Sequence, residues 1–180
     1  MKLNRLAAVL TAALCCVLAL GMTGCGSGGA LSDDDVQAIT SDVSSRLDQL
    51  KAGSGDSVDL VKETATGYIG KQLDDMGISV DDVVAAYLQG FDYEVGDVTG
   101  TGGSATCQVK LTCRSVTGIV ADFQAKSKGL SDEEAGQVLL QCIADAPLTE
   151  QEADAYCQKG SDGIWECLDG LKQALVKLCF

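Results

Sequence analysis

The cysteines are the side chains of this sequence most able to do chemistry. The sequence holds nine cysteines and no histidine. Cys15 and Cys16 lie inside an apolar run near the N-terminus, and Cys25 follows that run. The other six are Cys107, Cys113, Cys142, Cys157, Cys167 and Cys179. An even number of cysteines in an exported chain predicts a disulfide set, here of up to three bridges.

Two other uses of these thiols fit the spacing less well. The six contain no C-x-x-C pair, and without histidine they cannot complete a common zinc site, so we expect no metal and no cofactor. The same missing pair disfavours a redox-active dithiol. A set of partly free, buried thiols stays open as the alternative to three bridges. Cys107 and Cys113 cannot bond to each other within one strand, because six residues of strand span about 20 Å.

Acid–base chemistry would have to rest on carboxylates and tyrosines, because the missing histidine removes the commonest general base. The candidates for such an enzyme are Asp92, Asp122, Tyr68, Tyr87 and Tyr93. A structural role explains the same residues: the aspartates can be solvated surface side chains, and the tyrosines can be core residues whose hydroxyl reaches solvent. We therefore expect no catalytic residue. The candidate lining residues of a pocket are Tyr68, Tyr87, Tyr93 and Trp165.

The first 25 residues have the layout of a secretory leader. Lys2 and Arg5 precede an uncharged apolar run at residues 6–20, and small residues follow that run. The ending M-T-G-C at residues 22–25 resembles the lipobox of bacterial lipoprotein precursors, with methionine where the pattern usually has leucine. This resemblance implies that Cys25 becomes the N-terminus and carries a diacylglyceryl thioether.

Such a modification implies an anchor in the lipid bilayer and a chain that faces the extracytoplasmic side of the cell membrane. Plain secretion after cleavage near Gly24 is one alternative. A retained transmembrane helix is another, but the apolar run is short for a span of about 20 residues. In addition, residues 26–29 (GSGG) are a tether composition and lack the basic cluster that follows a membrane span.

The charge of the chain excludes one class of partner. Lys2 and Arg5 belong to the leader, so the rest holds 11 of the 13 basic residues against all 26 acidic ones, a formal charge of −15. Such a surface repels phosphate backbones, and we expect no nucleic-acid binding. The acidic runs at residues 33–35 and 81–82 lack the spacing and the glycine of a calcium loop, so they indicate helix starts.

The hydrophobic pattern predicts both helices and strands. Alternation at residues 91–98 and 105–113, around the glycine-rich turn 99–103, predicts a hairpin of two strands. Apolar residues at steps of three and four, with capping residues before them, predict helices instead. These helices are expected over residues 32–52, 56–76, 79–90, 116–128 and 131–146.

The last third of the chain predicts a second hairpin, this time of helices. Pro147 ends the helix over residues 131–146, and the T-E-Q-E sequence at 149–152 opens another helix immediately. The short connection favours an αα-hairpin over residues 131–159. Cys142 and Cys157 would lie at comparable heights in it, which favours a bridge between them. A strand at 164–167 and a helix at 168–180 complete the prediction.

This order of elements resembles the small extracytoplasmic lipoproteins with a nuclear-transport-factor-like (cystatin-like) cone. The resemblance lies in residues 91–95 (FDYEV), the turn leading to 105–111, and residues 161–166 (SDGIWE). It implies an α+β fold in which N-terminal helices pack on a small curved antiparallel sheet, here with the additional αα-hairpin. The expected organisation is a signal peptide at 1–24, a tether at 25–31 and a single domain at 32–180.

The resemblance and the lipobox together imply a membrane-anchored lipoprotein on the extracytoplasmic side. We expect a non-catalytic module that binds a ligand or a partner, either an envelope protein or a small apolar ligand. The alternative is a cone-fold enzyme that uses a buried Asp/Tyr pair.

Overall fold

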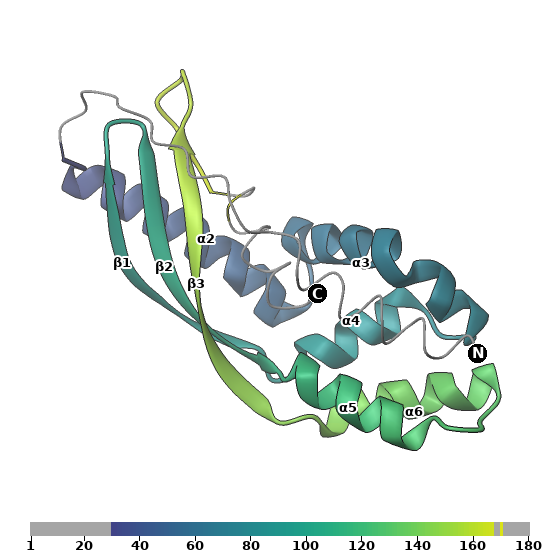
Figure 1. Ribbon diagram of the computed structural model, residues 1–180. Coiled ribbons are helices and arrows are strands. Elements are labelled where there is room, and N and C mark those ends of the chain that lie inside the picture. Colours follow the sequence, from purple (N-terminus) through teal and green to yellow (C-terminus); the bar gives the residue numbers. More distant parts are fainter. Residues whose placement is uncertain (1–29, 168–169, 171–180) are drawn as a thin grey trace.

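The computed structural model describes residues 30–167 and Gly170, and the fold within these residues is α+β. The described helices are α2 (Asp33–Ala52), α3 (Asp56–Asp75), α4 (Val80–Leu88), α5 (Val116–Lys126) and α6 (Asp132–Asp145). The described strands are β1 (Asp92–Thr101), β2 (Ser104–Arg114), β3 (Leu148–Lys159) and β4 (Trp165–Glu166). Figure 1 shows α2 along one face of the sheet and the other helices gathered at one end of it.

The four described strands form one open, curled sheet in the order β1-β2-β3-β4, with every neighbouring pair antiparallel. The β1–β2 hairpin is the predicted one, and its pairing register shifts between Val95 and Val98 at a β-bulge. Helices α5 and α6 connect β2 to β3. β2 ends and β3 begins at this connection. There the Ser115 amide donates to the Pro147 carbonyl oxygen over 2.9 Å, which holds the two strand ends together.

The inner face of the sheet packs on α2. The apolar stripe predicted from the sequence puts Ile39, Val43, Leu47 and Leu50 of α2 wholly out of contact with solvent. The sheet residues in the same cluster include Val109, Leu111, Cys107 and Cys157, all 2 % exposed or less. Burial of these side chains is the main force that holds the helix on the sheet. The concave side of the curled sheet is therefore filled by α2 (Figure 1).

A second apolar cluster lies among the helices at the far end of the sheet. It is formed by the last turns of α3 with α5 and α6, through residues such as Leu73, Phe123 and Leu139. Helix α4 lies between the two clusters, and its residues Val80 and Tyr87 pack against both. The molecule thus has two neighbouring cores joined by one short helix.

The helix predicted over residues 149–159 is wrong, because these residues form β3 (Leu148–Lys159). Eleven residues of β3 pair in register with β2, from Leu148 opposite Arg114 to Gln158 opposite Ser104. A helical hairpin does occur, one element earlier than predicted, between α5 and α6. The helix predicted over residues 168–180 lies outside the described residues, apart from Gly170.

Candidate binding surface

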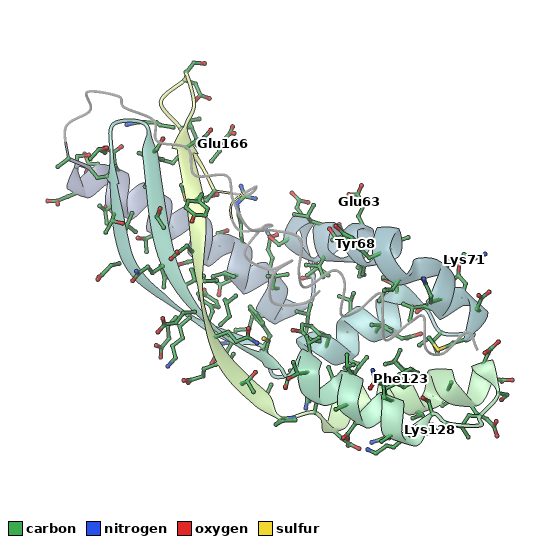
Figure 2. All side chains as sticks on the ribbon, viewed as in Figure 1. Glu63, Tyr68, Lys71, Phe123, Lys128 and Glu166 are labelled. Atoms are coloured by element: carbon green, nitrogen blue, oxygen red, sulfur yellow. A yellow bond between two sulfur atoms is a disulfide. The ribbon has the colours of Figure 1, made fainter. Side chains whose placement is uncertain are left out.

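The four aromatic residues predicted to line a pocket lie on four different elements and do not converge. Tyr68 is on α3, is 51 % exposed, and lies away from the sheet (Figure 2). Tyr87 of α4 lies between the two clusters, where its hydroxyl contacts the Cys113 thiol. Tyr93 and Trp165 lie on opposite edge strands, β1 and β4. These four side chains therefore do not line a common pocket.

Tyr93 joins β1 to α2. Its hydroxyl lies 2.7 Å from Asp48 Oδ1 and 3.2 Å from the Ser44 carbonyl oxygen, and it donates to these acceptors. Burial, with a further contribution from the Asp48 carboxylate, raises the pKa of Tyr93 to about 12. The phenol consequently stays protonated at neutral pH and acts as a hydrogen-bond donor between strand and helix.

Trp165 belongs to a polar junction around Asp35, at the start of α2. The Asp35 Oδ1 atom accepts from the Trp165 indole nitrogen over 2.8 Å and from Lys159 Nζ over 2.6 Å. Asp35 also closes a capping box with Ser32. Lys159, Trp165 and Ser32 together hold the pKa of the Asp35 carboxyl well below its usual range. This arrangement fixes β3 and β4 to the first turn of the helix.

The two aspartates named as catalytic candidates form ion pairs at the surface. Asp92 lies 2.7 Å from Lys51 Nζ, and the hydrogen bond from this lysine lowers the pKa of Asp92. Asp122 pairs with Lys126 over 2.9 Å within α5. Asp92 Oδ1 accepts from the backbone amide of Tyr93 over 2.9 Å, so this contact does not involve the phenol. Within the described residues, the predicted aspartates and tyrosines therefore do not form a buried Asp/Tyr pair.

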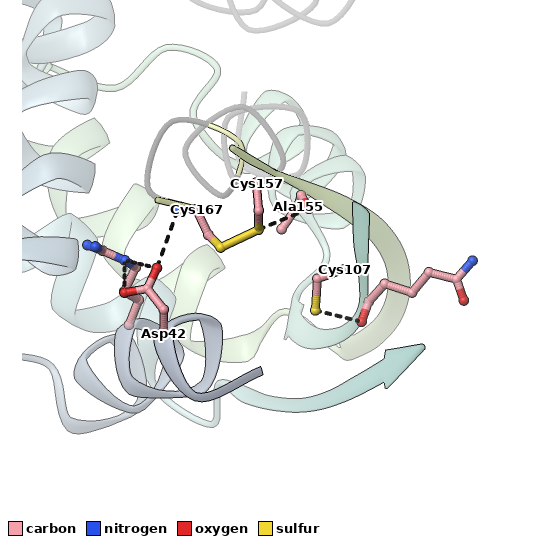
Figure 3. The surroundings of a disulfide bond; sticks show 7 residues. Asp42, Cys107, Ala155, Cys157 and Cys167 are labelled. Atoms are coloured by element: carbon pink, nitrogen blue, oxygen red, sulfur yellow. Dashed lines mark hydrogen bonds and ion pairs between the residues drawn. A yellow bond between two sulfur atoms is a disulfide. The ribbon is translucent and has the colours of Figure 1, made fainter. Parts of the chain in front are cut away.

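The described cysteines include one bridge, Cys157–Cys167, which joins β3 to the residue that follows β4 (Figure 3). The predicted bridge between Cys142 and Cys157 is wrong, because Cys142 lies on α6 in the helical cluster. Cys107, Cys113 and Cys142 are free and buried, and burial raises the pKa of each thiol. For these three, the alternative of free buried thiols holds. Cys25 and Cys179 lie outside the described residues.

The outward face of the sheet carries most of the exposed polar side chains of β1, β2 and β3. On β3, Glu150, Glu152 and Asp154 all point outward, because alternate residues of a strand share a face. In the middle of this face, Glu94 of β1, Lys110 of β2 and Glu152 of β3 stand opposite one another across the strands. Lys110 Nζ pairs with Glu150 over 2.8 Å. One lysine thus lies among four carboxylates, and we call this region the acidic sheet face.

A shallow hollow of about 240 Å³ opens in the acidic sheet face beside the bulge of β1. Gly96 deepens it, since glycine has no side chain on this outward face. The lining residues are Glu94, Val95, Gly96, Gln108, Val109, Lys110, Glu152, Ala153 and Asp154. The hydrogen bond that Lys110 donates to Glu150, with Glu94 and Glu152 nearby, raises the pKa of Lys110. The same carboxylates give the hollow a negative potential suited to a cationic group.

The sequence interpretation missed this surface because it placed residues 149–159 in a helix. On a helix, Glu150, Glu152 and Asp154 would be spread around the axis, whereas on a strand they line up. The signal that could have found the surface is the acidic residue at every second position. Among the described residues, no group of three or more histidine, cysteine, aspartate or glutamate side chains could hold a metal ion.

A helix that combines the length and the apolar character needed to cross a bilayer does not occur in the described part of the chain.

Comparison with known proteins gives a structural relationship only. No family model matches the sequence, and no curated protein matches it. Among solved structures, the fold resembles the crystal structure of YcdA from Bacillus subtilis subsp. subtilis strain 168, a protein assigned as a lipoprotein. The TM-score is 0.54 at 16 % sequence identity, over 81 % of this chain and 56 % of YcdA. The chain therefore spans just over half the length of YcdA, and the two share a fold.

Proposed function

We propose that this protein is a lipid-anchored extracytoplasmic binding module that holds a cationic segment of an envelope protein on its acidic sheet face. The anchor rests on the lipobox at residues 22–25, with acylation at Cys25. The resemblance of the globular part to nuclear-transport-factor-like lipoproteins supports the same class. The likeness to YcdA, a protein assigned as a lipoprotein, is compatible with it. The proposal does not include catalysis, because Tyr93 and Asp92 are engaged in bonds between β1 and α2, and Asp122 pairs with Lys126 within α5.

The acidic sheet face with its hollow is the observation that carries the binding role. A small apolar ligand is the less suitable occupant, because α2 fills the concave side of the sheet and the hollow is lined mainly by charged and small residues. A lysine or arginine side chain of a partner could instead enter between Glu94, Glu152 and Asp154. Such exposed pairs each contribute up to about 1 kcal/mol and are screened by salt, which suits a reversible contact.

The test is the affinity for a lysine octapeptide carrying a fluorophore, measured by fluorescence anisotropy at low salt and at about 0.15 M salt. The variant Glu94→Gln, Glu152→Gln, Asp154→Asn should bind about tenfold more weakly at low salt, because it loses three exposed ion pairs. The matched control is Glu63→Gln, Asp74→Asn, Asp75→Asn, which removes the same charge from exposed positions on α3. The control should change the affinity less than about twofold.

Equal weakening by both variants would overturn the proposal, since it would show that only the net charge attracts the peptide. Loss of folding in either variant is excluded by comparing their thermal unfolding with that of the unaltered protein. All six substituted side chains are exposed, so their replacement should leave the free energy of unfolding nearly unchanged.

A further inference from the structure

We infer that one end of the molecule rests on the lipid bilayer, with the side chain of Ile164 inserted at the membrane interface. The inference rests on the anchor proposed above and adds which surface the membrane covers. The surface consists of the β1–β2 turn (residues 101–104) and the β3–β4 turn (residues 160–164), and we call it the turn end.

Three segments meet at the turn end. Ala30, the first described residue, forms an isolated antiparallel bridge with Thr101 at the tip of the β1–β2 hairpin. The amide of Lys159 donates to the carbonyl oxygen of Gly103 over 2.8 Å, which brings the β3–β4 turn beside the β1–β2 turn. Figure 1 shows both turns at the end of the sheet opposite to α5 and α6. The chain thus enters the fold at the turn end.

The distance along the chain from the lipidation site then limits how the molecule can stand. Cys25 precedes Ala30 by five residues, so its Cα lies within about 18 Å of the Ala30 Cα even if the chain between them is fully extended. Helix α2 begins at the same end and, with 20 residues, extends about 30 Å away from it. The turn end is therefore the part of the fold that the acyl chains hold nearest to the membrane.

The chemistry of the turn end suits an uncharged membrane interface. Residues 98–109, which include the β1–β2 turn, contain no charged side chain, in a chain of which 22 % is charged. Ile164 is 63 % exposed, more than any other large hydrophobic side chain described as exposed. Asp162, the acid of the β3–β4 turn, accepts the Ile164 backbone amide over 3.0 Å and so folds back on its own turn. Asp33 and Asp34 are the exposed acids nearest in sequence to Ala30, and they favour neutral over anionic headgroups.

This orientation agrees with the proposed binding role, because it leaves the acidic sheet face uncovered. The acidic sheet face lies along the middle of the strands, between the turn end and the end of the sheet at α5 and α6. A partner in the envelope could therefore reach it from the side while the protein stays anchored.

The test is quenching of tryptophan fluorescence by brominated lipids in phosphatidylcholine vesicles. Ile164→Trp places a reporter at the turn end, and Tyr68→Trp places one on α3, at a site that is also about half exposed. The native Trp165 is buried and supplies a constant background that the unaltered protein measures. We expect Ile164→Trp to lose about half of its added emission in brominated vesicles, because acyl-chain bromines quench only tryptophans at membrane depth. Tyr68→Trp should lose none.

Each variant is attached to vesicles in two ways, so that failure of the orientation and failure of the anchor can be told apart. One form is the lipidated protein, whose intact mass reports the thioether on Cys25. The other replaces residues 1–25 by a histidine tag that binds nickel-chelating lipids at the same point of the chain. Quenching of neither reporter, or of both equally, in the tagged form would overturn the orientation. An unmodified Cys25 in the first form would overturn the anchor alone.

Discussion

Asp35 shows how a single carboxylate can join three segments of a chain. It caps the first turn of α2 through Ser32, and it accepts hydrogen bonds from Lys159 of β3 and Trp165 of β4. The Lys159 ammonium group also lies 5.7 Å from the centre of the Trp165 ring, within the range of a cation–π contact. The end of the sheet that carries the short strand β4 is thereby held on the helix by polar bonds, and the disulfide Cys157–Cys167 joins β3 to the residue after β4.

Asp35→Asn should lower the unfolding temperature at pH 7, and the loss should shrink in acid. The folded-state pKa of Asp35 lies below the ordinary carboxyl value of 3.8, so its carboxylate stabilises the fold fully above pH 4. The contribution then falls as the pH drops from about 4 toward the folded-state pKa. Thermal melts at pH 7, 4 and 2.5 should show the unaltered protein and the variant drawing together at the lowest pH.

Asp34→Asn is the matched control, since Asp34 lies in the same acidic first turn but is exposed. It should shift the unfolding temperature much less than Asp35→Asn at pH 7. A difference between Asp35→Asn and the unaltered protein that stays constant across the three pH values would contradict the ionised hydrogen-bond network described for Asp35.

At the scale of the elements, most boundaries could be predicted because local chemistry and tertiary packing agree. Ser32, Ser79 and Ser131 each cap the helix that they were expected to start, and the apolar stripe of α2 is the buried one. The β1–β2 hairpin also follows its alternating pattern. In these segments the residue types favour the same structure that the rest of the fold requires.

β3 could not be predicted in this way because its inward residues give a weak signal. The inward positions hold Thr149, Gln151, Ala153, Ala155 and Cys157, which are small or polar. Alanine, glutamate and glutamine also favour helices when no neighbour is considered. Pairing with eleven residues of β2 overrides that local preference. Because these residues were predicted to be helical, the acidic sheet face was missed and the wrong Cys142–Cys157 bridge was favoured. Both depend on which element lies opposite β3.

The packing of α6 gives a prediction at the same scale. A Cβ on Gly136 of α6 would lie 2.5 Å from the Met76 carbonyl oxygen, at the turn after α3, whereas a Cβ on Gly67 of α3 would meet nothing within 4 Å. Gly136→Ala should therefore cost about 1–3 kcal/mol of stability, because the backbone must move apart. Gly67→Ala should instead add about 0.5–1 kcal/mol, because alanine is the better helix former.

Urea unfolding of the two variants measures both effects. The substitution is the same and both sites are helical, so helix propensity alone would give the two variants the same sign. Stabilisation by Gly136→Ala would show that α6 does not approach the Met76 turn as closely as described.

The whole molecule is organised as two apolar clusters that meet through α4. Trp165 belongs to the cluster under the sheet, whereas Phe123 belongs to the cluster among the helices. Tyr87 packs against both. This division could not be predicted from sequence, because the patterns that identify an apolar helix face do not say which neighbour covers it. Among the described residues, the apolar stripe of α2 fills the concave side of the sheet, and the sequence pattern alone could not show that this stripe would face the sheet.

Tyr87→Ala should uncouple the two clusters. Removal of a large, partly buried aromatic side chain costs about 3 kcal/mol, and here the loss falls on the contact that joins the clusters. In urea, the fluorescence of Trp165 should report the sheet cluster, and circular dichroism at the helix band should report mainly the helices. We expect the two transitions to coincide in the unaltered protein and to separate in the variant.

Tyr68→Ala serves as the control, because Tyr68 is also a helical tyrosine but is 51 % exposed. Its transitions should still coincide, with a change in stability of about 0.5 kcal/mol or less. If Tyr87→Ala lowered the stability while both signals still changed together, the two clusters would be one cooperative unit that needs no connection through α4.

The irregularity of β1 also affects how copies of this protein behave beside one another. β1 is the first strand of the sheet, and the outer edge of such a strand offers amide and carbonyl groups to which another chain could add. The bulge between Val95 and Val98 interrupts that row, and Glu94 and Asp97 place negative charge along it. Proteins concentrated on a surface collide edge to edge far more often than they do in dilute solution. A bent, charged border of this kind protects against lateral polymerisation, so crowding need not lead to aggregates.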